Sequence, residues 1–270
     1  MKESVDRRMM ISDKEKLIVE KLLVYKKSYG MLIGDAFTNN PEAEQFIKED
    51  WNAFLFAVIF DQQIKAERAW AIPLELKKRL GHLDVCKIAS MSGNKLLEIF
   101  KKPTALHRWI NKMPIWIKSA CEKLITNYEG KTENIWRDTK DAKIIIERFD
   151  DFDGISQKKS TMAVNFLVDY FKIPLTNWEN IDISVDLMVR RVFKRLGIVP
   201  ENATDEEIIR KARVLMPSFP GDLDYATWDI GRYWCLLKNP YCYYKENGIE
   251  DNCPLVKECQ SVKLLYKGIQ

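Results

Sequence analysis

Four of the six cysteines in this chain lie close together, in the stretch WCLLKNPYCYYKENGIEDNCPLVKEC (residues 234–259). They are Cys235, Cys242, Cys253 and Cys259, with the spacing C-x6-C-x10-C-x5-C. Clustered cysteines in a protein of a reducing compartment suggest metal ligands more readily than disulfides. Four thiolates can hold an iron–sulfur cluster or a zinc ion, although the first pair is wider than the usual zinc spacing. The stretch therefore predicts a metal centre of one of these two kinds.

A second candidate site is the segment DFDGISQKKSTMAVNFL (residues 151–167), where a short turn with Gly154 separates two expected helices. Such a turn and the following helix N-terminus can direct backbone N–H groups toward a phosphate. Lys158 and Lys159 fall in the first turn of the second helix, where the helix dipole disfavours a positive charge. A neutral lysine amine is a nucleophile. On these residues alone, an ordinary turn followed by exposed lysines is the simpler interpretation.

The third candidate is Asp186, in the segment ISVDLMVRRVFKRLGI (residues 183–198). It directly precedes an expected helix over Leu187–Leu196, which Gly197 would end. An aspartate at this position either caps the helix or offers its carboxylate to a reaction. Taken alone, the residue favours the capping role.

Helices have to position all these residues, because helical spacing dominates the chain. Capping boxes at Ser12–Glu15 and Thr204–Glu207 begin two of them, and a further expected helix runs over Gln157–Tyr170. We find no convincing strand pair, so the expected fold is all-α. The chain has 270 residues and a formal charge of +4, which permits a polyanionic partner without requiring one. No apolar stretch is long enough to span a bilayer, so we expect no membrane association and a cytoplasmic, nucleoid-associated location.

Three of these segments together resemble the endonuclease III branch of the helix-hairpin-helix DNA glycosylases. The resemblance rests on GISQKKSTMAVN, on SVDLMVRRVFKRLG and on GRYWC with CPLVKEC, and it extends from about Trp51 to Cys259. It implies two α-helical domains. A central helical barrel would comprise residues 41–171, and a second domain would combine residues 1–40 and 172–270 and include the cysteine loop at 235–259.

The resemblance also implies roles for individual residues. Lys158 matches the nucleophilic lysine of bifunctional members without a gap, so it is preferred to Lys159, and Asp186 matches the catalytic aspartate. Gln63 matches a glutamine that fills the space left by an extruded base, although a polar helix-end residue is an equal alternative. Further implied DNA contacts are Ile115 near the wedge loop (with a core position as the alternative), Gly154 and Ser156 in the hairpin, and Lys238 in the cysteine loop.

The family's four cysteines surround a [4Fe-4S] cluster, so the resemblance selects iron–sulfur as the cofactor. This chain departs from the family in three places. The loop between Cys242 and Cys253 is longer by eight residues, Ser156 replaces the second hairpin glycine, and Leu187-Met188 follow Asp186 in place of Thr-His.

The implied function is excision of a damaged or mispaired base from double-stranded DNA by a monomeric DNA glycosylase with AP lyase activity. One alternative is a monofunctional glycosylase in which Asp186 activates water. The other is a non-catalytic DNA-binding iron–sulfur protein.

Overall fold

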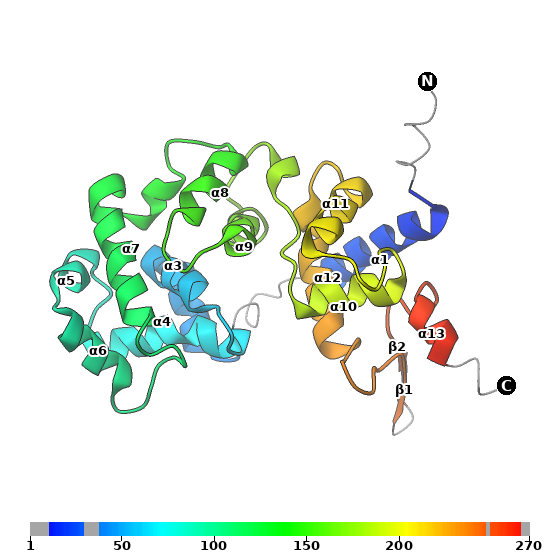
Figure 1. The fold of residues 1–270 in the computed structure, drawn as a ribbon, viewed down its shortest axis with the longest axis horizontal. Helices are drawn as coiled ribbons and strands as arrows, with labels where there is room; N and C mark the ends of the chain where they lie inside the picture. Colours follow the sequence, from blue (N-terminus) through cyan, green and yellow to red (C-terminus); the bar gives the residue numbers. More distant parts are fainter. Residues whose placement is uncertain (1–10, 30–37, 247–248, 266–270) are drawn as a thin grey trace. The chain divides into compact units, whose positions relative to one another are not determined.

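The computed structural model describes residues 11–29, 38–246 and 249–265, which divide into two compact units. One unit comprises Met31–Thr176, and the other combines Met1–Gly30 with Asn177–Gln270. The expected division placed the domain boundaries after residues 40 and 171. Each unit is helical, as the sequence predicts (Figure 1).

The unit Met31–Thr176 is built around α3 (Trp51–Phe60). All residues of α3 from Ala53 to Phe60 are fully buried, so this helix is apolar on every side. Its neighbours include the helices α2, α4 and α7. The remaining elements are α2 (Pro41–Glu49), α4 (Ala66–Leu80), α5 (Val85–Ser90), α6 (Gly93–Lys101), α7 (Met113–Tyr128), a 3-10 turn (Thr132–Ile135), α8 (Ala142–Asp150) and α9 (Gln157–Asp169).

The other unit centres on α10 (Leu187–Leu196) and α12 (Asp224–Tyr233), which pack directly together. A Cβ atom at Gly231 would lie 2.6 Å from the Met188 Cβ, so only glycine permits this approach. α1 (Asp13–Tyr29) and α11 (Asp205–Leu215) complete the core, with Ile18, Leu22 and Phe193 among its fully buried side chains. The short elements are two 3-10 turns (Trp178–Asn180 and Pro220–Leu223) and α13 (Gln260–Leu265).

One expectation about secondary structure is wrong. The strands β1 (Tyr243–Glu246) and β2 (Ile249–Asn252) form an antiparallel hairpin, with Tyr243 opposite Asn252. This hairpin occupies the lengthened loop between Cys242 and Cys253. No helix among the described residues is both long enough and apolar enough to cross a membrane.

Candidate functional site

The hairpin between α8 and α9 has a backbone that requires glycine at one position. Gly154 has φ +82°, and a Cβ atom there would lie 2.5 Å from the Trp116 ring. The turn is closed by hydrogen bonds from Phe152 N to Phe149 O (3.1 Å) and from Ile155 N to Phe152 O (3.0 Å). Both the left-handed conformation and the approach of Trp116 therefore exclude larger residues.

Ser156, which replaces the family's second hairpin glycine, fits the hairpin without strain. It is the N-cap residue of α9 with φ −122° and ψ 171°, an extended conformation open to any residue. Its side chain makes no capping hydrogen bond, so no hydroxyl occupies the first amides of α9. Ser156 thus preserves the backbone geometry of a helix N-terminus that can receive a phosphate.

The two hairpin lysines lie in opposite environments. Lys158 is exposed, whereas Lys159 is only 6% exposed and its Nζ donates to Val58 O (2.9 Å) and Ile59 O (3.1 Å). Burial lowers the pKa of Lys159 to about 7, with Lys158 adding to this effect and Asp61 opposing it. The lysine whose pKa is lowered is therefore enclosed in the core, and geometry decides first which amine can reach a substrate.

Sequence reasoning did not detect the burial of Lys159. The sequence offered only a partial signal, because Lys159 shares one helical face with the apolar residues Ala163 and Leu167, which are both buried in the structure. The lysine thus occupies a core-facing position of α9.

Two glutamines follow α3, and their side chains differ in surroundings. Gln62 Nε2 donates to Gly154 O at 2.6 Å, which joins the α3–α4 turn to the hairpin. Gln63, the residue predicted to fill the space of an extruded base, is exposed and has φ +52°. Arg108 Nη1 donates to Gln63 O at 3.2 Å and so holds the backbone of this turn. The structure therefore presents Gln63 outward beside the hairpin, while its contact with DNA remains a prediction.

Ile115 lies in the first turn of α7 and is 64% exposed, so the alternative of a core position is wrong. It lines a pocket of about 390 Å³ together with Asn94, Asn111 and Lys118. An apolar side chain this exposed fits a wedge that inserts between bases, which remains a prediction.

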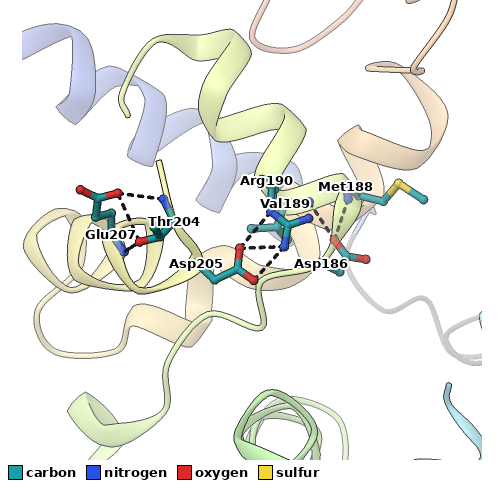
Figure 2. Close-up of polar contacts among 7 residues, drawn as sticks. All are labelled: Asp186, Met188, Val189, Arg190, Thr204, Asp205 and Glu207. Carbon is teal, nitrogen blue, oxygen red and sulfur yellow. Dashed lines mark hydrogen bonds and ion pairs between the residues drawn. The ribbon is translucent and has the colours of Figure 1, made fainter. Parts of the chain in front are cut away.

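Asp186 caps α10 in the second unit, as the sequence predicts. Its Oδ1 accepts hydrogen bonds from Met188 N and Val189 N, both at 2.8 Å (Figure 2). Among the residues that the structure describes, none donates to the other oxygen, Oδ2. The nearby Asp182, by contrast, is 4% exposed and has both oxygens bonded to Arg213 at 2.7 Å. Of these two carboxylates, Asp186 is therefore the one with an oxygen that no described residue occupies.

α10 is also held firmly at its start and at its end. Arg190 donates to both carboxylate oxygens of Asp205, which fixes the first turn of α10 to α11 (Figure 2). Toward the other end, Arg195 Nη1 donates to Leu236 O at 2.7 Å and approaches Cys235 Sγ at 3.3 Å. The helix that carries Asp186 thus also contacts the cysteine loop.

The four clustered cysteines line one pocket of about 490 Å³, together with Arg195, Trp234 and Val262. Burial raises the pKa of the Cys253 thiol to about 12, and the other three cysteines add to this shift. Burial likewise raises the pKa of Cys242, with contributions from Cys259 and Cys235. The four sulfurs therefore interact electrostatically around a single space.

The fit of this pocket to a metal depends on the kind of centre. Among the described residues, no three His, Cys, Asp or Glu side chains are grouped closely enough to hold one metal ion. In a [4Fe-4S] cluster each cysteine binds a different iron, so its sulfurs stand further apart than those around one zinc ion. Four thiols around a pocket of this size fit a cluster better than a single ion. Lys238 is exposed between the first two cysteines.

Lys158 belongs to the unit Met31–Thr176, and Asp186 belongs to the other unit.

Comparisons with proteins of known sequence identify the chain's relatives. A provisionally named DNA repair glycosylase of Methanocaldococcus jannaschii is 23% identical over 181 residues, 66% of this chain and 72% of that protein. An isoleucine–tRNA ligase of Cytophaga hutchinsonii is 35% identical over 95 residues, which are 34% of this chain. The match spans only 8% of the ligase's length.

Solved structures share the fold. A trapped covalent endonuclease III–DNA intermediate has a TM-score of 0.65 at 18% identity, covering 96% of this chain and 100% of that one. A non-covalent endonuclease III–DNA complex gives 0.64 at 18% identity, with the same coverage of both chains. A thermostable thymine-DNA glycosylase gives 0.63 at 15% identity, covering 93% of this chain and 97% of that one.

Residues 56–218, more than half of the chain, match the family described as HhH-GPD superfamily base excision DNA repair protein. This range includes the Gly154 hairpin, Lys158 and Asp186. The chain belongs to the HhH-GPD superfamily of base excision DNA repair proteins.

Proposed function

We propose that this protein is a DNA glycosylase with AP lyase activity, which releases a damaged or mispaired base from double-stranded DNA and then cleaves the strand. The observation that carries the proposal is the hairpin itself. Its Gly154 turn and uncapped α9 N-terminus offer a phosphate site, and the next residues place the Lys158 side chain in solvent. A phosphate held there would bring the DNA backbone close to an exposed amine.

Lys158 is the proposed nucleophile. Its nitrogen lone pair forms a bond to the sugar C1′, while the bond from C1′ to the base breaks and the base leaves with that electron pair. The attacking nitrogen then releases a proton, which neutralises the departed base. The nitrogen lone pair next forms the Schiff base to C1′ as the bond from C1′ to the ring oxygen O4′ breaks, and O4′ takes up a proton. Removal of a C2′ proton permits elimination of the 3′ phosphate, which cleaves the strand.

Asp186 is proposed to stabilise the positive charge that develops on the sugar as the base departs. A carboxylate acts in this way only when the bond is breaking, so its effect falls on the rate rather than on binding. This role is supported by the capping hydrogen bonds, because within the described part of the chain they occupy Oδ1 and leave Oδ2 without a donor.

We also propose that Cys235, Cys242, Cys253 and Cys259 hold a [4Fe-4S] cluster. When bound, the cluster would stabilise the C-terminal loop, since binding four thiolates ties distant parts of the chain together. The chain's own contribution is the pocket, with Arg195 directed at Cys235 Sγ and the exposed Lys238 beside it.

The test uses a panel of duplexes that each carry one lesion or mismatch. Base release and strand cleavage are measured under single-turnover conditions, and borohydride is added to trap any Schiff base. Release with trapping supports the proposal. Release without trapping assigns the protein to the monofunctional class, with Asp186 activating water. Binding without release from any duplex would make it a non-catalytic DNA-binding protein.

A further inference from the structure

The C-terminal end of α3 presents buried carbonyl groups that need partners from elsewhere. The last four carbonyl groups of a helix accept no hydrogen bond from N–H groups within that helix. In α3 they belong to Ala57, Val58, Ile59 and Phe60, all of which are 0% exposed. Water therefore does not satisfy them, and each must be paired by another part of the chain.

Three different segments supply these partners. Asp61 N donates to Ala57 O at 3.0 Å, and Phe60 O accepts from Gln62 N at 2.6 Å and bonds His107 Nε2 at 3.2 Å. Gln62 Nε2 also makes a long hydrogen bond of 3.4 Å to Ile59 O. Lys159 Nζ, from the hairpin, takes both Val58 O and Ile59 O. Loss of this amine would leave two buried carbonyls without their strongest donor, so the contact is costly to break.

The turn after α3 is thereby attached to the hairpin at two points. Lys159 binds the last turn of α3, and Gln62 Nε2 binds Gly154 O at 2.6 Å. Gln63 lies immediately beyond, exposed and in a left-handed conformation. The exposed side chains of Gln63 and Lys158 therefore project from two pieces of backbone that are fastened together.

We propose that Lys159 is a positioning residue, whose buried amine fixes the turn that presents Gln63 against the hairpin that presents Lys158. The inference rests on the proposed function, because Gln63 and Lys158 are the side chains expected at the extruded base. It differs from a nucleophilic role for Lys159, since the amine acts by holding α3 and contacts no substrate.

The charge of Lys159 gives this attachment a characteristic dependence on pH. Buried, the amine has a pKa of about 7, and on opening of the turn it would return to the ordinary value of 10.5. Between these values the open state binds more protons than the closed state. The closed turn is therefore stabilised as pH rises through this window, and the stabilisation is lost as pH falls to about 7.

The other charged groups around the amine act differently. Asp61 favours the protonated amine, whereas the neighbouring Lys158 disfavours it. Burial lowers the pKa of His107 below its ordinary 6.5, and Arg68 and Lys159 contribute to this shift. Effects of His107 are thus confined to more acidic conditions than those of Lys159.

The test is hydrogen exchange measured by mass spectrometry on the intact protein without DNA. Peptides that cover residues 57–65 and 151–157 are followed in wild type, in Lys159→Met and in the adjacent exposed-lysine control Lys158→Met. In wild type and in the control, protection relative to intrinsic exchange should rise by up to about tenfold per pH unit above pH 7. In Lys159→Met this rise should vanish. If protection in the wild-type protein does not change with pH, the inference is overturned, even if the Lys159→Met variant does not fold. It is also overturned if Lys159→Met folds and its protection is the same as that of wild type.

A second measurement connects the attachment to DNA. The probe is a duplex with a tetrahydrofuran abasic-site analogue opposite 2-aminopurine, whose fluorescence reports what stacks beside it. The apparent affinity for this duplex is obtained from the fluorescence change on titration with protein. Lys159→Met and Gln63→Ala should each lower that affinity about tenfold relative to wild type. If exchange is altered but Lys159→Met binds as wild type does, the positioning role is refuted. If wild type does not bind this duplex, the proposed function fails, and the exchange data still decide whether Lys159 fixes the turn.

Discussion

Replacement of Asp186 by asparagine separates the two roles of this residue. Asp186 Oδ1 accepts from Met188 N and Val189 N at 2.8 Å, and an asparagine oxygen can occupy the same place. Aspartate and asparagine are similar as N-caps, so the cap survives, and loss of the charge at the helix N-terminus costs about 0.3–1 kcal/mol. Asp186→Ala, which removes the acceptor, should lower the free energy of unfolding by about 0.5–2 kcal/mol.

The effect on base release should be much larger than the effect on stability. Removing one preorganised group that stabilises a transition-state charge typically costs on the order of 10²–10³ in rate, or about 3–4 kcal/mol. We therefore expect Asp186→Asn to slow excision by a factor on the order of 10² while it binds duplex DNA nearly as wild type does.

The assay is single-turnover base release with enzyme in excess, accompanied by duplex affinity at one fixed salt concentration and by urea unfolding. Salt must be fixed because phosphate contacts make every affinity depend on it. If Asp186→Asn releases base at the wild-type rate while Asp186→Ala is less stable, Asp186 is a helix cap and nothing more. Asp182 would not replace it, because its pairing with Arg213 leaves neither oxygen available.

Three further outcomes are expected. Lys158→Ala should abolish borohydride trapping on lesion DNA, whereas Lys159→Ala should still be trapped at a reduced rate; the reverse result would move the nucleophile to Lys159. The purified protein should carry about four iron atoms per chain, and Cys242→Ser should lower both iron content and folded yield; zinc in their place would refute the cluster. Gly154→Ala should lower the free energy of unfolding by about 2 kcal/mol or more, because Gly154 has φ +82° and its Cβ position meets the Trp116 ring. The control Gly81→Ala should lower it by only about 1 kcal/mol, because Gly81 has φ +80° but nothing within 4 Å of its Cβ position. Equal losses would show that the contact with Trp116 has no effect.

Signals that depend on neighbouring residues were readable from the sequence. The capping box at Thr204 is confirmed, with Glu207 Oε2 accepting from Thr204 N at 2.8 Å (Figure 2). That at Ser12 is confirmed by the bond from Ser12 N to Glu15 Oε2, also 2.8 Å. The start and end of α10 agree with the prediction as well. In each case the residues concerned are a few positions apart, so sequence spacing alone fixes the contact.

Features that depend on distant partners were not readable in the same way. The burial of Lys159 follows from carbonyls about a hundred positions earlier, whose need for a donor arises only once α3 is enclosed.

The β1–β2 hairpin was missed for another reason. Its strands are four residues each and largely polar, so they lack the alternating pattern by which strands are recognised. The sequence does contain Asn-Gly at residues 247–248, a dipeptide typical of hairpins, and sequence reasoning did not use it.

The attachments of α10 link the chemistry of the cysteines to that of the carboxylate. Asp186 begins the helix, and Arg195 contacts the cysteine loop one residue before its end. Ten helical residues form a stiff rod about 15 Å long, so a displacement at one end is transmitted as a tilt at the other. The cysteine loop and Asp186 are therefore fastened to opposite ends of one rigid element, and a displacement of the loop would move the carboxylate as well.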